Sequence, residues 1–204
     1  MITIIDYGVG NIFAFQNVYK RLNIPIKIAK ASKDLFDAEK LILPGVGSFD
    51  YAMKQLNNSG MRVKLDELVI EEKVPIIGIC VGMQMMGNRS DEGKFEGLKW
   101  IDSEILKFDE NLIQQRTKLP HMGWNDVTPI NNHPLFRGLE KEAIFYFLHS
   151  FYFKCNNPNE SIAISDYGIS FTSAVNRDNI FGIQFHPEKS HQYGEKLLYN
   201  FAKL

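Results

Sequence analysis

Cysteine is scarce in this chain of 204 residues, because only Cys80 and Cys155 are present. Two cysteines do not make a disulfide framework. An excess of one charge is also missing, since 23 Lys and Arg residues face 24 Asp and Glu residues. The resulting net charge of −1 argues against a general electrostatic binder of nucleic acid.

Long apolar runs are absent too, so no segment is predicted to cross a bilayer and no membrane partner is expected. The five histidines are scattered without the paired spacing of zinc ligands, and no metal or other cofactor is predicted. The first residues, Met1–Asp6, contain no basic region and are predicted to form a strand, not a signal peptide. We expect a cytoplasmic protein, because a reducing compartment keeps a thiol free.

The segment Val74–Asn88 is the most informative part of the sequence. An apolar run, predicted to be a buried strand, leads to a tight turn at Cys80 and then at once to a helix. Gly78 and Gly82 flank Cys80 two residues away on each side, the cysteine counterpart of the G-x-S-x-G nucleophile elbow. A helix N-terminus beside the sulfur favours the reactive thiolate. A buried structural cysteine is the alternative for this motif taken alone.

A second motif, Gln184–Glu188, supplies groups that could act with a cysteine. His186 falls where the apolar run Phe181–Phe185 stops. Pro187 favours extended geometry at His186, so we expect His186 and Glu188 to project to the same side of an extended backbone. A carboxylate beside an imidazole can fix its tautomer and stabilise the imidazolium. Taken alone, His-Pro-Glu is also compatible with a surface turn.

The order of predicted elements indicates an α/β fold in one domain, residues 1–204. The first half alternates strands with amphipathic helices, which predicts a mostly parallel sheet with helices on both faces. After residue 95, short strand-like runs separated by turn residues predict an antiparallel part. The predicted strands are 2–5, 26–29, 40–43, 76–79, 144–148, 151–154, 162–165, 170–175 and 180–185.

A glycine-rich turn, Pro44–Gly47, follows the predicted strand 40–43. Ligands of parallel sheets bind outside the carboxyl ends of the strands, so this turn, Cys80 and His186 are expected to converge on one crevice. Amides of this turn, together with that of Val81, could donate to a developing oxyanion. A plain structural turn is the alternative.

These motifs together resemble the class I (triad) glutamine amidotransferases, and within that family the glutaminase subunits of imidazole glycerol phosphate synthases. The segments Leu119–Asn125 and Tyr146–Ser150 strengthen the resemblance, and all the motifs run in family order over nearly the whole chain. The resemblance implies a flavodoxin-like three-layer sandwich. It also implies hydrolysis of L-glutamine and a HisF-like cyclase subunit as partner in a heterodimer.

The resemblance further implies roles for individual residues. Cys80 would be the nucleophile, His186 the acid and base, and Glu188 the partner that orients His186. The oxyanion site would be formed by Gly45, Val46, Gly47 and Val81. Glutamine would be held by Gly47, Gln84, Glu92 and Ser150. The partner synthase would be faced by Trp124, Tyr146 and Lys189.

Other assignments remain open at this point. Trp100–Asp102 and Ser190–Gly194 are more similar to a paralogous branch that supplies ammonia, through a cyclase-like partner, to a sugar amidotransferase of surface-glycan synthesis. A cysteine peptidase or deglycase of similar fold and a non-catalytic binding subunit are further alternatives. Gly87–Arg89 also departs from the family, which often has a Phe-Glu pair there.

Overall fold

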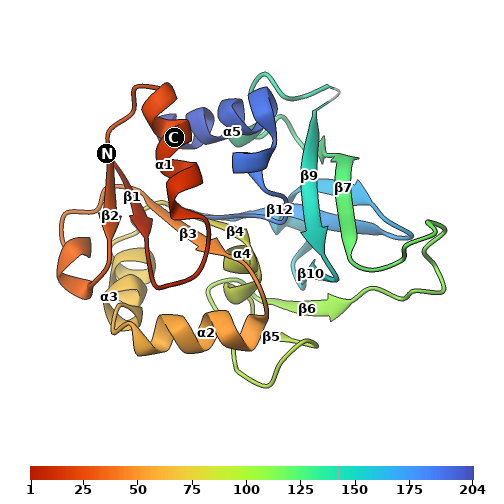
Figure 1. Ribbon diagram of the computed structural model, residues 1–204, viewed down its shortest axis with the longest axis horizontal. Helices are drawn as coiled ribbons and strands as arrows, with labels where there is room; N and C mark the ends of the chain where they lie inside the picture. Colours follow the sequence, from red (N-terminus) through yellow and green to blue (C-terminus); the bar gives the residue numbers. More distant parts are fainter. Residues whose placement is uncertain (142) are drawn as a thin grey trace.

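A computed structural model describes residues 1–141 and 143–204. Among these residues, eleven strands form one mixed sheet that runs through the protein (Figure 1). Its main path has the order β2-β1-β3-β4-β13-β12-β10-β6-β5, and β11 and β8 extend it beside β12. These strands are β1 (Ile2–Ile5), β2 (Ile26–Ala29), β3 (Leu41–Gly45), β4 (Ile76–Cys80), β5 (Arg89–Ser90), β6 (Ser103–Lys107), β8 (Thr128–Pro129), β10 (Phe151–Cys155), β11 (Ser161–Asp166), β12 (Ser170–Arg177) and β13 (Ile180–Ile183).

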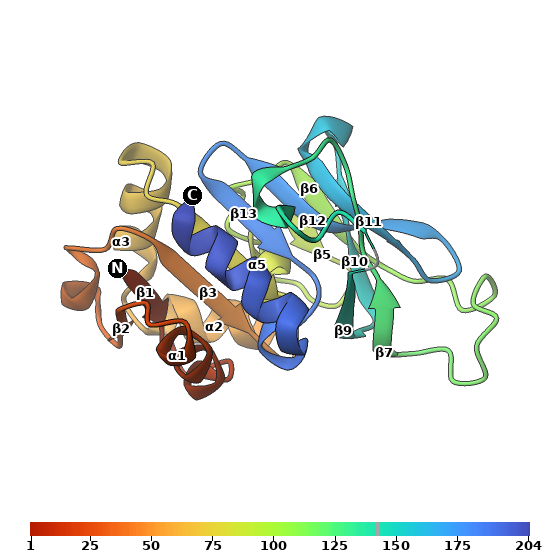
Figure 2. The ribbon, with the colours of Figure 1, turned by 90° about the horizontal axis from the view of Figure 1, so that it is seen from above.

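Helices cover both faces of the parallel part of the sheet. Helices α1 (Ile12–Arg21) and α5 (His191–Lys203) lie across one face, and α2 (Phe49–Asn58) and α3 (Arg62–Asp66) cover the other (Figures 1 and 2). The short helix α4 (Val81–Met85) directly follows β4. This arrangement is the predicted three-layer α/β sandwich.

Strands β1, β3, β4 and β13 lie side by side in parallel and are buried along their whole length. Because helices cover both faces, their sequences are nearly continuous apolar runs and do not alternate with polar residues. The predicted parallel core is therefore confirmed. The carboxyl ends of β3, β4 and β13 lie at the same edge, which brings the segments that follow them close together.

The C-terminal part is antiparallel, as predicted. Strand β12 pairs antiparallel with β11, β10 and β13, and the turns near residues 166–168 and 177–180 are hairpin connections. A separate two-stranded sheet is formed by β7 (His121–Asp126) and β9 (Ile144–His149). Strand β7 was not predicted, because Gly123 and Asn125 have low strand propensity and its stability depends on pairing with β9.

The ends of several strands differ from the prediction. Strand β3 extends to Gly45 and β4 to Cys80, so both reach the turns that carry the motif residues. Strand β13 ends at Ile183, two residues earlier than predicted. Its parallel pairing with β4 stops at the pair Ile183–Ile79, and the chain beyond turns toward β9, where the amide of His186 donates to the carbonyl of Tyr146 (2.8 Å).

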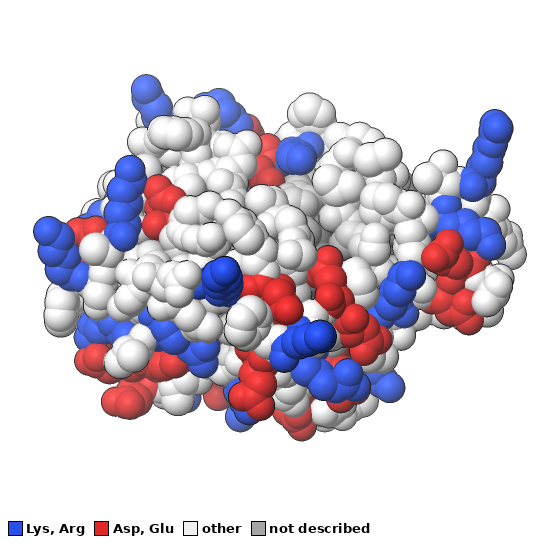
Figure 3. Space-filling model, turned by 60° about the horizontal axis from the view of Figure 1, so that its bottom comes forward, with Lys and Arg blue, Asp and Glu red and all other residues white. Residues whose placement is uncertain are grey.

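Surface charge is mixed. On the face drawn in Figure 3, acidic and basic side chains lie among each other and neither sign covers a broad area. In the described part of the chain, every helix is too short or too polar to reach across a lipid bilayer. The same residues contain no cluster of three or more His, Cys, Asp or Glu side chains placed to hold a metal ion.

Candidate active site

Cys80 lies on a strained turn between β4 and α4, as the glycine spacing predicted. Its backbone has φ 54° and ψ −111°, a region that residues with a Cβ rarely adopt. Helix α4 begins at the next residue, so its first N–H groups lie beside the sulfur. The turn therefore holds the thiol at the carboxyl edge of the sheet.

Glycines make this turn possible because three backbone segments touch there. A Cβ at Gly82 would lie 2.0 Å from the carbonyl oxygen of Leu43, and one at Gly45 would lie 2.2 Å from the amide nitrogen of Gly82. A Cβ at Gly78 would lie 2.6 Å from the carbonyl oxygen of Gly82. Strand β3 and the first turn of α4 can approach this closely only without side chains at these positions.

His186 and Glu188 form a buried pair, but not in the way the sequence suggested. The Nδ1 atom of His186 lies 2.9 Å from Oε1 of Glu188, and both side chains are 3% exposed. His186 is extended, with φ −103° and ψ 94°. The prediction of an extended backbone through Pro187 was wrong, because residues Pro187–Lys189 form a 3₁₀ turn. The turn curls the Glu188 side chain back to the imidazole instead of placing both on one face of a strand.

The charge on His186 is set by two neighbouring side chains, Cys80 and Glu188. Burial alone would lower the pKa of His186, but the nearby Cys80 sulfur and the Glu188 carboxylate raise this pKa to about 10. Nδ1 carries the proton that is donated to Glu188, since a carboxylate only accepts. An imidazolium beside a thiolate is the state from which a cysteine nucleophile reacts.

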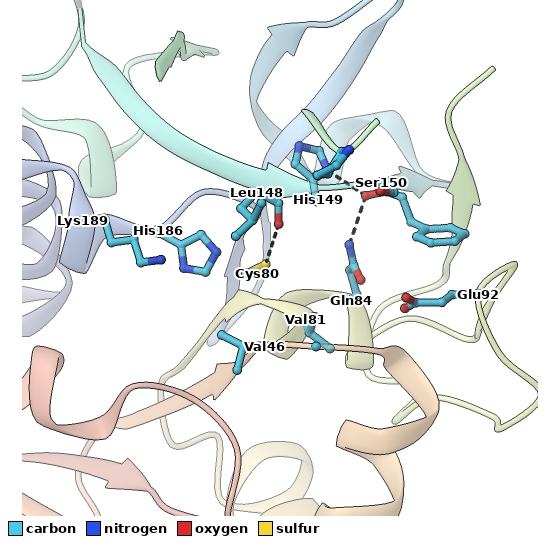
Figure 4. A pocket seen from close by; sticks show the side chains of 13 residues that line it. Val46, Cys80, Val81, Gln84, Glu92, Leu148, His149, Ser150, His186 and Lys189 are labelled. Atoms are coloured by element: carbon cyan, nitrogen blue, oxygen red, sulfur yellow. Dashed lines mark hydrogen bonds between the residues drawn. The ribbon is translucent and has the colours of Figure 1, made fainter. Parts of the chain in front are cut away.

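A pocket of about 290 Å³ opens beside Cys80. Cys80, His186, Gln84 and Glu92 all border it (Figure 4). Its lining contains most of the residues selected from the sequence: Val46, Gly47, Cys80, Val81, Gln84, Glu92, Ser150, His186 and Lys189. Four other selected residues do not line it: Gly45, Trp124, Tyr146 and Glu188.

Two of these four lie directly behind the pocket wall. Gly45 ends β3, is paired with Cys80 and is buried. Its place beside the Cys80 turn therefore depends on its small size. Glu188 reaches the site only through His186. Gly47 has φ +83° and open space around its Cα, so its backbone can present an amide that a side chain would otherwise restrict.

Glu92 is held at the rim of the pocket by the start of α2. Its Oε2 accepts from the amide of Phe49 (2.8 Å), while Asp50 accepts from the amides of Lys94 (2.9 Å) and Phe95 (3.0 Å). Removal of water from the carboxyl raises the pKa of Glu92; the Phe49 amide opposes this rise and nearby Asp50 adds to it. The loop that departs from the family pattern thus still places a carboxylate at the pocket.

Comparison with known proteins identifies the family to which this chain belongs. The family model for class-I glutamine amidotransferases matches residues 3–204. The chain belongs to the class I glutamine amidotransferases. The fold predicted from the resemblance is thereby confirmed, because a solved glutamine amidotransferase superposes with a TM-score of 0.76 over 99% of this chain and 97% of its own, at 18% identity.

Curated relatives match this amidotransferase over its full length. The imidazole glycerol phosphate synthase subunit HisH of Bdellovibrio bacteriovorus is 53% identical, and that of Leptospira interrogans is 51% identical. In both comparisons the match covers 100% of this chain and 100% of the relative. These values show that the similarity extends well beyond the short motifs around the pocket.

The three residues expected to face a partner lie together on the surface of this amidotransferase. Trp124 and Tyr146 are cross-strand neighbours on β7 and β9, with ring centroids 6.2 Å apart. The Nζ atom of Lys189 lies 5.5 Å from the centre of the Tyr146 ring. Trp124 is 45% exposed, although tryptophan is usually largely buried. Lys189 connects this surface to the pocket, which it also lines.

Sequence reasoning assigned no role to some residues at the site of this amidotransferase. Leu148, His149 and Phe151 line the pocket, and the Leu148 carbonyl lies 3.9 Å from Sγ of Cys80. Gln184 is fully buried, and its Nε2 lies 3.7 Å from the same sulfur. A signal for Gln184 was present, since a polar residue interrupts the apolar run just before His186.

Proposed function

We propose that this protein is the glutaminase subunit of an imidazole glycerol phosphate synthase. In this role it hydrolyses L-glutamine to glutamate and ammonia, and the ammonia passes to a HisF-like cyclase partner that makes imidazole glycerol phosphate and AICAR in histidine biosynthesis. The observation that carries the proposal is the pocket lined by both Cys80 and His186, with the buried Glu188 bound to His186 behind the pocket wall. Residues 1–204 act as one domain in a cytoplasmic protein, where both free cysteines stay reduced.

The proposed reaction begins with attack by the Cys80 thiolate on the side-chain amide carbon of glutamine. The new C–S bond gives a tetrahedral intermediate with a negative oxygen. His186 then transfers its proton to the leaving nitrogen, the C–N bond breaks, and ammonia departs from a γ-glutamyl thioester. Water deprotonated by His186 attacks the thioester, and glutamate leaves as the Cys80 thiolate re-forms. Glu188 stabilises the imidazolium whenever it forms.

The negative oxygen needs hydrogen-bond donors that are already in place. The amide of Val81, at the start of α4, lies next to the sulfur in the chain, and the exposed turn at Val46 and Gly47 borders the same pocket. Loss of one such donor typically lowers kcat by about 10² to 10³. Glutamine itself is held in the proposal by Gly47, Gln84, Glu92 and Ser150.

Ammonia released into solvent would be wasted, so the proposal includes a docked partner. The exposed cluster of Trp124, Tyr146 and Lys189 lies next to the pocket and suits the centre of such an interface, because aromatic residues dominate interface cores. We expect low glutaminase activity in the isolated protein and a rise when the partner binds its own ligand, which is a coupling between two sites. Ammonia delivery to surface-glycan synthesis is not favoured by the full-length similarity to HisH subunits.

The test is glutamate release by the purified protein mixed with a HisF-type cyclase and that cyclase's ligand. Cys80→Ala is expected to abolish the release, whereas Cys155→Ala, which removes the other thiol, is expected to retain it. Full activity in Cys80→Ala would refute the assignment of the nucleophile. Activity only with a sugar-amidating system would move the protein to the glycan pathway, and peptide hydrolysis without glutamine hydrolysis would make it a peptidase.

A further inference from the structure

A continuous line of hydrogen bonds runs from β7, on the Trp124 surface, to the sulfur of Cys80. Its outer links are Asn125 Nδ2 to His121 Nε2 (3.2 Å), His121 Nδ1 to His149 Nε2 (2.9 Å) and His149 Nδ1 to the Phe151 carbonyl (2.8 Å). Its inner links are Gln84 Nε2 to the same carbonyl (3.1 Å), Gln84 Nε2 to Gln184 Oε1 (3.0 Å) and Gln184 Nε2 to Cys80 Sγ (3.7 Å). We call these groups the polar relay. Figure 4 shows the middle of the relay, where Gln84 and His149 approach one carbonyl.

The polar relay is buried except at its outer end. Asn125 is partly exposed, and the next four side chains along the relay are 0% to 6% exposed: His121, His149, Gln84 and Gln184. The His121 ring is stacked between Phe147 (4.7 Å) and Tyr167 (4.0 Å). Little of these side chains is accessible to water, so each group depends mainly on its neighbours for hydrogen bonds.

The outer half of the polar relay can be ordered in only one direction. The Asp166 carbonyl accepts from Asn125 Nδ2 (2.9 Å), so the amide nitrogen of Asn125 also faces His121, whose Nε2 must accept. His121 then carries its hydrogen on Nδ1 and donates it to Nε2 of His149. His149 in turn carries its hydrogen on Nδ1 and donates it to the Phe151 carbonyl.

Both imidazoles are neutral in this order. Burial lowers the pKa of His121 to about 4, and burial together with the neighbouring His121 lowers the pKa of His149 to about 3. An additional proton on either ring would set two N–H groups against each other. The relay therefore keeps one set of tautomers at neutral pH.

The inner half follows from the same rule. A carbonyl only accepts, so the Gln84 amide must turn its nitrogen to Phe151, and that nitrogen also lies 3.0 Å from the side-chain oxygen of Gln184. With its oxygen engaged there, Gln184 must turn its nitrogen toward Cys80. Gln184 therefore presents an N–H group, and not its own oxygen, to the sulfur.

We propose that Gln184 is a further catalytic residue, whose side-chain N–H stabilises the thiolate of Cys80, and that His121 and His149 are positioning residues that fix its orientation. A hydrogen bond to an anionic acceptor is stronger than a hydrogen bond between neutral groups. If the Gln184 amide were reversed, its oxygen would lie against the thiolate and repel it. The role in glutamine hydrolysis rests on the proposed function. The effect on the thiolate does not, and it can be measured without turnover.

The first experiment measures alkylation of Cys80 by iodoacetamide at near-neutral pH, with each cysteine followed by mass spectrometry. Gln184→Met keeps the length of the side chain but has no N–H, and we expect the Cys80 rate to fall about tenfold. Phe185→Leu, a buried change at the next residue without a relay link, is the matched control and should keep the wild-type rate. Burial raises the pKa of the Cys155 thiol to about 12, so Cys155 remains mostly a thiol in the same sample.

The pH dependence separates thiolate stabilisation from obstruction of the reagent. With rising pH, the ratio of wild-type to Gln184→Met rates should approach one, because both sulfurs become fully ionised. A ratio that stays constant with pH, or equal rates at neutral pH, would overturn the proposal. Absence of glutaminase activity in the wild-type protein, with the alkylation difference present, would instead refute the proposed function alone.

The second experiment tests the order of the relay and does not depend on how well Gln184→Met folds. Imidazole nitrogen NMR of the wild-type protein should show hydrogen on Nδ1, and not on Nε2, in both His121 and His149. His149→Phe keeps a ring in the same place but breaks two links, and it should slow Cys80 alkylation in the same direction as Gln184→Met. Hydrogen on Nε2 of His149, or unchanged alkylation in His149→Phe, would overturn the positioning role.

Discussion

Glu188→Gln removes the carboxylate that helps to hold a proton on His186, without changing the size of the side chain. The carboxylate lies 2.9 Å from Nδ1, and both side chains are 3% exposed, so solvent screens the pair little. An opposite charge at such a distance typically shifts a pKa by about 1 to 3 units. We therefore expect the pKa of His186 to fall from about 10 to between about 7 and 9.

The change should appear first in the pH dependence of activity. The proposed reaction needs a protonated His186 to release ammonia, so kcat/KM for glutamine should decline on the alkaline side as this proton is lost. In Glu188→Gln the decline is expected about 1 to 3 pH units lower than in the wild type. Coincident alkaline limbs in the two proteins would refute the account. Glu195→Gln is the matched control, since Glu195 pairs with Arg21 on the surface (2.6 Å).

Stability should change in the same pH range. The folded pKa of His186 lies above its ordinary value of 6.5, so folding takes up a proton and gains stability that is complete below about pH 6.5. That gain declines as pH rises and is gone above about pH 10. Because one pKa unit corresponds to about 1.4 kcal/mol, Glu188→Gln should lose about 1 to 4 kcal/mol at low pH and little in strong alkali. Denaturant unfolding at several pH values measures this difference.

Three further substitutions test other parts of the structure. Gly82→Ala should lower the free energy of unfolding by about 3 kcal/mol or more, measured by thermal unfolding, because its methyl group would lie 2.0 Å from the Leu43 carbonyl oxygen. In the control Gly60→Ala the methyl group has open space, so the loss should be only the roughly 1–2 kcal/mol that a positive φ costs. Equal losses in the two variants would contradict this. Trp124→Ala should leave the melting temperature unchanged and weaken binding of the cyclase by about 2 kcal/mol in calorimetry, and unaltered affinity would exclude Trp124 from the interface. Glu92→Gln should raise KM for glutamine more than it lowers kcat. In the wild type KM should rise as pH falls, because the raised pKa of Glu92 means that its carboxylate is protonated at a higher pH than an ordinary glutamate. A KM independent of pH would argue against a role of this carboxylate in binding glutamine.

The sequence contained enough to predict the parts of the site that depend on neighbouring residues. Gly78 and Gly82 indicated the turn at Cys80, because only glycine fits where backbones touch. Apolar runs without alternation predicted strands β1, β3 and β4, since strands covered on both faces need no polar positions. The meeting of Cys80 and His186 at one edge followed from the rule for ligands of parallel sheets.

Other features had no local signal. The 3₁₀ turn that brings Glu188 back to His186 replaced the extended backbone expected from the proline, because hydrogen bonds from Ser190 to the His186 carbonyl (2.6 Å) and from His186 to Tyr146 (2.8 Å) hold the chain there. Strand β7 forms only because β9 pairs with it along its whole length. Neither the contacts that hold the 3₁₀ turn nor the pairing of β7 with β9 can be identified from residue spacing within one segment.

Residue types and local spacing thus determined the proposed nucleophile, the turn that carries it and the layers of the fold, because steric limits and apolar periodicity act within a few residues. Tertiary structure alone decided which polar atoms face each other. Gln84 and Gln184 are 100 residues apart in the chain, yet their bond sets which atom is presented to Cys80. Such a bond depends on the order of strands in the sheet and on the burial that excludes water, and both arise only when the whole chain has packed.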